Sequence, residues 1–223
     1  MIIVVPFAGP VSTAVAGVMI ESCRKTMPHV PIWQLTDEDT PKLDGVAGTI
    51  RRKWTGELAT FHLEHMSNLP EDEILRLDYD LIVKRDVTPV FGFKFDLALT
   101  RRPLNDPTCG NLMRVKNPHN HGVIFLRPKA KLFFERALEE YSSIENKDRW
   151  MDIAYALENA AASDVCRWIE LPGERYNYTP KKRDEDVSFA DIIHYKGDRK
   201  HWMIDNDQAR RDGEAVLRMV ENR

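Results

Sequence analysis

The chain has 223 residues, of which 43% are hydrophobic and 30% charged, and its formal net charge is −3. This length suffices for one large domain or two small ones, and the composition is that of a folded rather than a disordered protein. The charge gives no overall sign of a polyanion partner, and the longest apolar runs are too short to span a membrane. Three widely spaced cysteines argue against a disulfide framework or a thiolate zinc site, so we expect a cytoplasmic protein.

The first part of the chain alternates between strand and helix patterns. Residues 1–9 form an apolar run that ends in Pro and Gly, which indicates a buried strand followed by a loop. Residues 11–26 have apolar side chains at helical spacing, with Ser12 or Thr13 as the N-cap, and residues 30–39 read as a second strand. This β-α-β order predicts a parallel sheet with helices outside it.

The rest of the chain continues these patterns without an internal repeat or a long linker. The clearest helix, 129–143, is amphipathic, and its expected apolar face is formed by Leu132, Phe133, Ala137, Leu138 and Tyr141. We expect further helices at 56–69, 148–163 and 207–223, and strands at 72–86, 95–102, 121–128, 166–172 and 190–197.

Two aspartates, Asp78 and Asp80, follow the apolar residues ILRL. In a strand, residues i and i+2 point to the same side, so the two carboxylates would form one compact acidic site. Oxygen ligands of this kind suit Mg²⁺ or Mn²⁺. Because ligands of open α/β sheets bind beyond the carboxyl ends of strands, the position favours a metal site. The alternative is a pair of loop carboxylates, one of which caps a turn.

A second polar segment, HYKGDRKHW at 194–202, also follows an apolar strand pattern. A neutral His194 imidazole is a good metal ligand, and Gly197 lets the backbone approach a ligand closely. Lys200 offers a compact positive charge for a phosphate group. The alternative is a surface His and Lys on a basic loop, with Trp202 in the core.

Together these segments resemble the retaining glycosyltransferases of family 8, which have the GT-A fold. ILRLDYDLIVKRDVTPVF, at 74–91, is similar to that family's D-x-D segment and its D-x-x-P-h-F ending. The later segment is similar to the family's H-x-x-G-x-x-K-P-W signature, with His201 in place of the proline. Between them, HNHGVIFLRP resembles an N-x-G segment through Asn120 and Gly122. The matches keep their order over nearly the whole chain.

The resemblance implies an α/β protein with a Rossmann-like GT-A fold, whose mixed, mostly parallel sheet is flanked by helices in a single domain over 1–223. It implies a nucleotide-binding half over about 1–95 and a sugar- and acceptor-binding half over about 96–223. The implied activity is metal-dependent transfer of a hexose, with retention, from a nucleotide-sugar to a hydroxyl group. We expect a UDP-sugar as the donor. A glycan, a small molecule, a protein or a modified nucleic acid could be the acceptor.

The resemblance also assigns roles to individual residues. Asp78, Asp80 and His194 match the ligands of a Mn²⁺ or Mg²⁺ ion that bridges the two phosphates of the donor. Gly197 and Lys200 match the segment that closes over the diphosphate. A divalent cation and a lysine would together stabilise the charge that grows on the leaving diphosphate.

Three further positions complete the implied site, and two of them depart from the family pattern. Asn120 matches a residue beside the donor sugar, and we take Asn120 and Asp152 as the candidate catalytic residues. Asp152 matches the Asp of an Asp-Gln pair, but Ile153 stands where the Gln would be. Asp152 would bind the sugar or the acceptor hydroxyl, unless it is only a carboxylate on a helix surface. His62 lies where relatives place an Arg for the phosphates, so either the phosphate clamp is weaker or another Arg forms it.

Two other functions fit parts of the sequence. A nucleotidyltransferase would also use paired carboxylates and a divalent cation, but PFAGPVSTA after the first strand lacks the basic residues of a phosphate-binding loop. A degenerate transferase could bind a glycan or nucleic acid through the basic runs 51–53, 101–102 and 181–183. The C-terminal tail mixes acidic and basic residues and has no aromatic ones, so we expect no stable membrane association.

Overall fold

The main element of the computed structural model is a seven-stranded sheet. The residues that the structure describes are 1–9, 13–54, 58–103, 118–145 and 149–205. The strands of the sheet are β1 (Ile2–Pro6), β2 (Ile32–Thr36), β3 (Gly48–Arg51), β4 (Ile74–Leu77), β6 (Leu97–Arg101), β7 (His119–Leu126) and β8 (Trp168–Leu171).

The order of the strands in this sheet is β3-β2-β1-β4-β7-β6-β8. The pairs β1–β2, β1–β4, β2–β3 and β6–β8 are parallel, whereas β7 runs antiparallel to both β4 and β6. The central strands β1 and β4 are buried along their whole length, as expected for strands covered on both faces. The predicted mixed, mostly parallel sheet is therefore confirmed.

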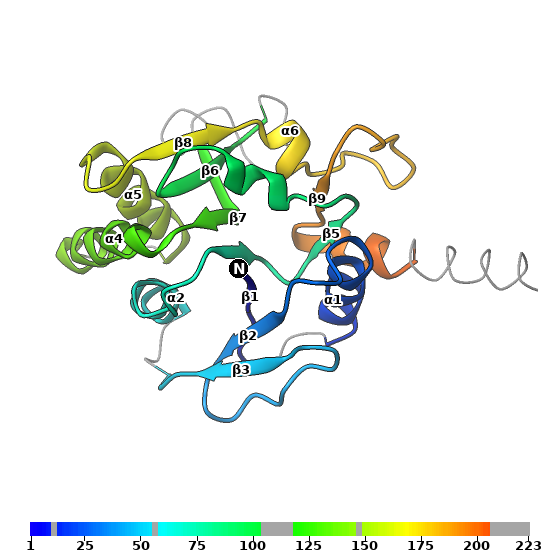
Figure 1. Ribbon diagram of the computed structural model, residues 1–223, viewed down its shortest axis with the longest axis horizontal. Helices are drawn as coiled ribbons and strands as arrows, with labels where there is room; N and C mark the ends of the chain where they lie inside the picture. Colours follow the sequence, from blue (N-terminus) through cyan, green and yellow to red (C-terminus); the bar gives the residue numbers. More distant parts are fainter. Residues whose placement is uncertain (10–12, 55–57, 104–117, 146–148, 206–223) are drawn as a thin grey trace, which may run out of the picture.

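Helices cover both faces of this sheet (Figure 1). Helix α1 (Thr13–Thr26) lies on one face, and α2 (Leu58–Ser67), α4 (Lys131–Ser143) and α5 (Arg149–Ala162) lie on the other. Each face buries its own apolar cluster, and these clusters supply most of the stabilising free energy. Short helical turns complete the fold: η1 (Thr88–Gly92), η2 (Pro128–Ala130), α6 (Gly173–Tyr176) and η3 (Gly197–Arg199).

A second, two-stranded sheet lies beside α1 and pairs β5 (Leu81–Val83) antiparallel with β9 (Ile192–His194). The prediction of one strand over 72–86 was therefore wrong, because β4 ends at Leu77 and the chain turns at residues 79–80 before β5 begins. The turn allows Asp80 to leave the line of β4 and reach β9. It also divides the apolar run between two sheets.

Several other expectations can be compared with the structure. In α4, Phe134 is buried and Leu132 is 37% exposed, so the predicted apolar face was wrong at Leu132. The edge strand β3 was not predicted, because Ile50 is its one buried residue and leaves little apolar signal. Ser12 and the helix expected at 207–223 lie outside the described residues.

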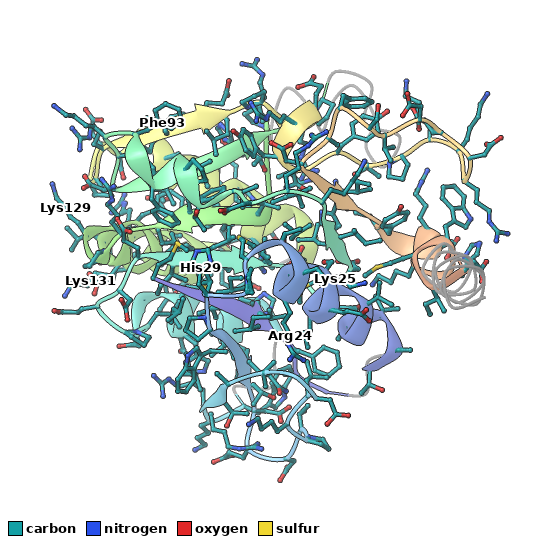
Figure 2. All side chains as sticks on the ribbon, turned by 45° about the vertical axis from the view of Figure 1, so that its right-hand side comes forward. Arg24, Lys25, His29, Phe93, Lys129 and Lys131 are labelled. Atoms are coloured by element: carbon teal, nitrogen blue, oxygen red, sulfur yellow. The ribbon has the colours of Figure 1, made fainter. Side chains whose placement is uncertain are left out.

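Charged side chains extend outwards from α1 and from the start of α4, as Figure 2 shows. Arg24 and Lys25 extend from the last turn of α1. Lys129 extends from η2, the turn before α4, and Lys131 is the first residue of α4. None of the helices in the described parts of the chain has the length and apolar character of a membrane span.

Candidate metal and donor site

Polar side chains gather where the two sheets meet, beyond the carboxyl end of β4. Asp78 follows β4 directly, and its backbone N–H donates to the carbonyl oxygen of Gly122 on β7 (2.8 Å). Asp80 lies at the end of the turn, where its carbonyl oxygen accepts from the backbone N–H of Tyr195 (2.9 Å). Main-chain hydrogen bonds therefore hold both aspartates against other strands. The predicted position beyond a strand end is observed.

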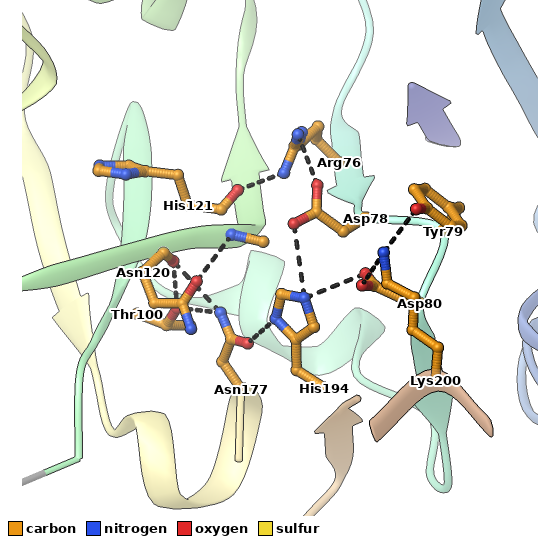
Figure 3. A network of polar contacts seen from close by, with 11 residues as sticks. Arg76, Asp78, Tyr79, Asp80, Thr100, Asn120, His121, Asn177, His194 and Lys200 are labelled. Carbon is orange, nitrogen blue, oxygen red and sulfur yellow. Dashed lines mark hydrogen bonds and ion pairs between the residues drawn. The ribbon is translucent and has the colours of Figure 1, made fainter. Parts of the chain in front are cut away.

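His194 completes a cluster of three candidate ligands with the two aspartates (Figure 3). Its Nε2 lies 3.1 Å from Asp80 Oδ1 and 3.6 Å from Asp78 Oδ2. One ligand atom from each of the three residues lies within 4.8 Å of the others. The register of the small sheet explains this approach, because His194 pairs with Leu81, directly after Asp80.

The orientation of His194 is set by Asn177, which the sequence did not reveal as a site residue. The Asn177 amide nitrogen donates to Thr100 Oγ1 (2.8 Å) and to the carbonyl oxygen of Asn120 (3.2 Å). Its amide oxygen is left to accept from Nδ1 of His194 (2.9 Å). Nε2 is therefore the ring nitrogen that faces the carboxylates and can bind a metal ion.

Strand β9 is fixed at its other end by a buried carboxylate, Asp191, which is 2% exposed. Its two oxygens pair with Arg85 (2.6 Å) and Arg175 (2.5 Å). A buried carboxylate is tolerated when its charge and lone pairs are satisfied in this way. The pairing connects β9 with the chain that follows β5 and with α6, and so it keeps His194 in place.

Lys200 provides a positive charge beside the cluster. Its Nζ lies 3.2 Å from Asp80 Oδ2, donates to the Tyr79 hydroxyl (2.6 Å) and sits 4.6 Å from the Tyr79 ring centroid. Burial alone raises the pKa of Asp80, but His194 and Lys200 outweigh it and lower the pKa to about 2. Asp80 is therefore ionised, and ready to bind a cation, throughout the physiological pH range.

Gly122 allows the two sheets to approach each other at the cluster. A Cβ atom at this position would lie 2.4 Å from His194 Cε1 and 2.9 Å from Asp78 Oδ2. Any larger residue would therefore push the two candidate ligands apart. The N-x-G pattern noted in the sequence has a physical reason here, since close packing of β7 on His194 requires the glycine.

Of the other predicted residues, Asn120 adjoins the cluster and Asp152 does not belong to it. Asn120 is 4% exposed, and its amide nitrogen is buried without a hydrogen-bond partner within the described structure. Asp152 lies on α5, half-buried, outside the network drawn in Figure 3. Gly197 begins η3 with a φ of +61°, a conformation that favours glycine, three residues before Lys200.

His62 lies on α2, on the same face of the sheet as Arg76. Burial lowers the pKa of His62 to about 3, and the nearby charges of Arg76 and His65 add to the effect. The His62 imidazole is therefore neutral at physiological pH. It can offer a hydrogen bond to a ligand, but it cannot replace the charge of an arginine.

Arginines of the three basic runs make contacts within the chain. Arg51 donates to main-chain carbonyl oxygens of the loop after β2. Arg101 pairs with Glu170 (3.0 Å), and Arg183 pairs with Asp205 (3.1 Å). Exposed pairs of this kind contribute little free energy, but they reduce the positive charge that a polyanion would meet.

Solved structures with a similar fold come from glycosyltransferases. No protein-family model matches the sequence, and no curated protein matches it. GlyE of Streptococcus pneumoniae, a glycosyltransferase, superposes with a TM-score of 0.58 and 17% identity over 90% of this chain and 59% of its own. The galactosyltransferase LgtC, solved with donor and acceptor sugar analogs, superposes with a TM-score of 0.58 and 15% sequence identity. The match covers 89% of this chain and 88% of LgtC.

A third similar structure is a glycosyltransferase involved in glycosylation of the major capsid of PBCV-1. It has a TM-score of 0.57 and 15% identity, and the match covers 94% of this chain and all of the other. At such identities the likeness is one of fold, and the chain has the GT-A fold of these enzymes. The resemblance predicted from the sequence is confirmed at this level. This chain spans 59% of the length of GlyE.

Proposed function

We propose that the protein is a metal-dependent glycosyltransferase that passes a hexose from a nucleotide-sugar, a UDP-hexose, to a hydroxyl group. One observation carries this proposal: Asp78, Asp80 and His194 meet beyond the carboxyl end of β4 in a GT-A fold. LgtC, which shares the fold, was solved with donor and acceptor sugar analogs. The donor is carried over from the resemblance in sequence and fold.

The three side chains fit a divalent cation. Two carboxylates and one imidazole suit Mn²⁺ and also Mg²⁺, and these three residues would hold the ion. Asp80 is ionised, and Nε2 of His194 points to both carboxylates. When bound, the cation supplies positive charge that stabilises the departing diphosphate.

Other side chains of the protein would bind the diphosphate and the sugar. Lys200, 3.2 Å from Asp80, can turn its ammonium group from that carboxylate to a phosphate oxygen. Gly197 lets the segment before Lys200 approach the diphosphate closely. The unpartnered amide nitrogen of Asn120 can donate to a sugar hydroxyl, which would satisfy a buried donor. His62 would add a neutral hydrogen bond near the phosphates.

The remaining assignments concern the sugar and its acceptor. We assign retention of configuration to the reaction and place Asp152 beside the sugar or the acceptor hydroxyl. Residues 1–95 would bind the nucleotide, and residues 96–223 the sugar and the acceptor. The acceptor would be a glycan, a small molecule, a protein or a modified nucleic acid. The buried free thiols of Cys23 and Cys166 suit the reducing cytoplasm, where we place the protein.

The test is a screen of nucleotide-sugars with Mn²⁺ or with EDTA, in which binding is followed by calorimetry and turnover by release of nucleoside diphosphate. We expect binding of a UDP-hexose that needs the metal, and slow donor hydrolysis without an acceptor. The Asp80→Asn variant should lose both. Release of pyrophosphate from a nucleoside triphosphate would instead identify a nucleotidyltransferase. Metal-independent binding of a glycan or nucleic acid, without affinity for nucleotide-sugars, would identify a degenerate binder and overturn the proposal.

A further inference from the structure

Arg76 is an unusual residue for its position in the fold. It lies in β4, between Leu75 and Leu77, and is 7% exposed. A buried guanidinium is costly unless its charge is paired and its N–H groups are hydrogen-bonded. Its strand runs into the candidate metal site. The contacts of Arg76 therefore bear on what that site can bind.

The contacts of Arg76 lead directly to a candidate ligand (Figure 3). Its Nη2 lies 2.7 Å from Asp78 Oδ1, and its Nη1 donates to the carbonyl oxygen of His121 on β7. The other oxygen of the carboxylate, Oδ2, is the one that faces His194. Arg76 therefore holds one oxygen of Asp78 and leaves the second for the site.

Two histidines near Arg76, His62 and His121, do not balance its charge. Burial lowers the pKa of His62 to about 3 and the pKa of His121 well below its usual range, and the charge of Arg76 adds to both effects. Both imidazoles are therefore neutral. The carboxylate that the structure pairs with Arg76 is that of Asp78, which becomes its counter-ion.

The second carboxylate of the site has its own cation. Lys200 lies 3.2 Å from Asp80, as Arg76 lies 2.7 Å from Asp78. The two negative charges are thus matched by two positive side chains. A divalent cation that enters alone meets a site with little net attraction and must approach a fixed guanidinium. A diphosphate that enters with the cation brings the negative charge that the site then lacks.

We infer that Arg76 positions Asp78 and weakens the binding of a metal ion alone, so that the site takes up metal and diphosphate together. This inference rests on the proposed function, because it assumes that Asp78 is a metal ligand. Arg76 acts here through Asp78 and through its charge. The flexible Lys200 can move away from Asp80, whereas Arg76 is held in β4 and cannot leave.

The test compares two substitutions that separate charge from packing. Arg76→Gln removes the charge and keeps an N–H donor for the carbonyl oxygen of His121, and Arg76→Lys keeps the charge. Mn²⁺ binding alone, and UDP binding at saturating Mn²⁺, are both measured by calorimetry. Arg136→Met, on the outside of α4, is the matched control because it removes one arginine charge away from the site.

We expect Arg76→Gln to bind Mn²⁺ alone at least about 5-fold more tightly and to bind UDP with Mn²⁺ about 10-fold more weakly, since the coupling between the two ligands is reduced. Arg76→Lys and Arg136→Met should bind Mn²⁺ alone, and UDP with Mn²⁺, with affinities close to those of the original protein. A purely structural role would weaken both kinds of binding. Weaker Mn²⁺ binding by Arg76→Gln would therefore overturn the inference.

The original protein provides a second test that does not depend on how well a variant folds. UDP should tighten Mn²⁺ binding by about 10-fold or more, which is within the usual range of coupling between two ligands. Equal Mn²⁺ affinity with and without UDP would overturn the inference even if the protein is a transferase. Failure of the proposed function looks different: the protein would bind no UDP with Mn²⁺, and Asp80→Asn would change nothing.

Discussion

The two sheets of this protein share one apolar cluster, which includes Leu81, Val83, Ile192 and Ile193 of the small sheet, but they differ in their polar contacts. In the large sheet, β1 and β4 are fully buried, and apolar clusters cover both faces. In the small sheet, β9 is held by the pairing of Asp191 with two arginines, and it ends at His194 within a polar network. The large sheet has a fold shared with known glycosyltransferases, and the candidate ligands lie where the two sheets meet. Substitutions of the candidate ligands should therefore impair the site more than the stability of the fold, whereas a substitution that crowds the contact between the sheets should lower both.

The largest effect should come from Asp80→Asn. The change removes the ionised carboxylate between His194 and Lys200 with almost no change of shape. We expect metal-dependent donor turnover to fall about 10²–10³-fold, equivalent to about 3–4 kcal/mol of lost transition-state stabilisation. Turnover with a UDP-hexose, and Mn²⁺ affinity by calorimetry, measure the effect.

Asp164→Asn is the control for that substitution. Asp164 is exposed between α5 and β8 with a φ of +58°, a conformation that Asn also adopts readily. Asp164→Asn removes one negative charge, as Asp80→Asn does, and we expect its turnover to be unchanged. An equal loss in both variants, or full activity of Asp80→Asn, would contradict the proposed metal site.

The next largest effect should come from Gly122→Ala, which places a methyl group where the two sheets touch. Its Cβ would lie 2.4 Å from His194 Cε1, so either β7 or His194 must move. We expect a loss of about 1–3 kcal/mol in the free energy of unfolding, because well-packed sites tolerate added atoms poorly. Metal affinity should fall as well. Urea unfolding and calorimetry give the two values.

Gly17→Ala is the matched control. Gly17 is exposed on α1, and a Cβ there meets nothing within 4 Å. Alanine is the better helix former, so this variant should gain about 0.5–1 kcal/mol. If Gly122→Ala were as stable as Gly17→Ala, the close contact of the two sheets at His194 would be refuted.

Asn177→Ala should have a smaller effect, which we expect mainly on the orientation of His194. It removes the acceptor for Nδ1 of His194 and the donor to Thr100 Oγ1. Groups that orient a metal-binding histidine typically contribute about 10–100-fold to metal affinity, and we expect a loss of that size. Asn177→Asp keeps an acceptor and should recover part of the affinity. Similar affinities for the Ala variant and the original protein would show that Asn177 does not orient the ring.

Much of this arrangement could be predicted from the sequence, because its signals are local. The apolar runs and helical periodicities located most elements, and Asp78, Asp80 and His194 stood out as polar residues after apolar strands. The edge strand β3 was missed because its one buried residue, Ile50, leaves no periodic pattern. Short edge strands are largely defined by their neighbour in the sheet rather than by their own sequence.

The supporting residues of the site were harder to foresee, since their roles depend on contacts distant in sequence. Asn177 belongs to residues 172–188, which are rich in Pro, Asn and charged residues and read as a loop. Its side chain nevertheless contacts residues of β6, β7 and β9. Arg76 did leave a signal, because it is a charge inside the apolar run ILRL. Only the fold shows that Asp78, two residues later, turns back to pair with it.

The effect that is smallest at neutral pH, and grows only as the pH falls, concerns His62 on the face of the large sheet that α2 covers. The pKa of His62 falls from 6.5 to about 3 on folding. The unfolded chain therefore binds a proton more readily than the folded protein. The stability that neutral His62 contributes is complete above about pH 6.5 and is lost as the pH falls towards 3, with a slope of up to about 1.4 kcal/mol per pH unit.

His62→Gln should remove that contribution and flatten the dependence of unfolding free energy on pH between 6.5 and 4, measured by urea unfolding. The slope that remains is expected from His121, whose pKa is lowered well below its usual range, chiefly by burial. His29→Gln is the control, because His29 is exposed after α1 and its loss should leave the slope unchanged. If His62→Gln kept the full slope, a positive charge at His62 would be tolerated. In that case the large sheet would tolerate a positive charge beside α2, and in this respect it would not differ from the region where the two sheets meet.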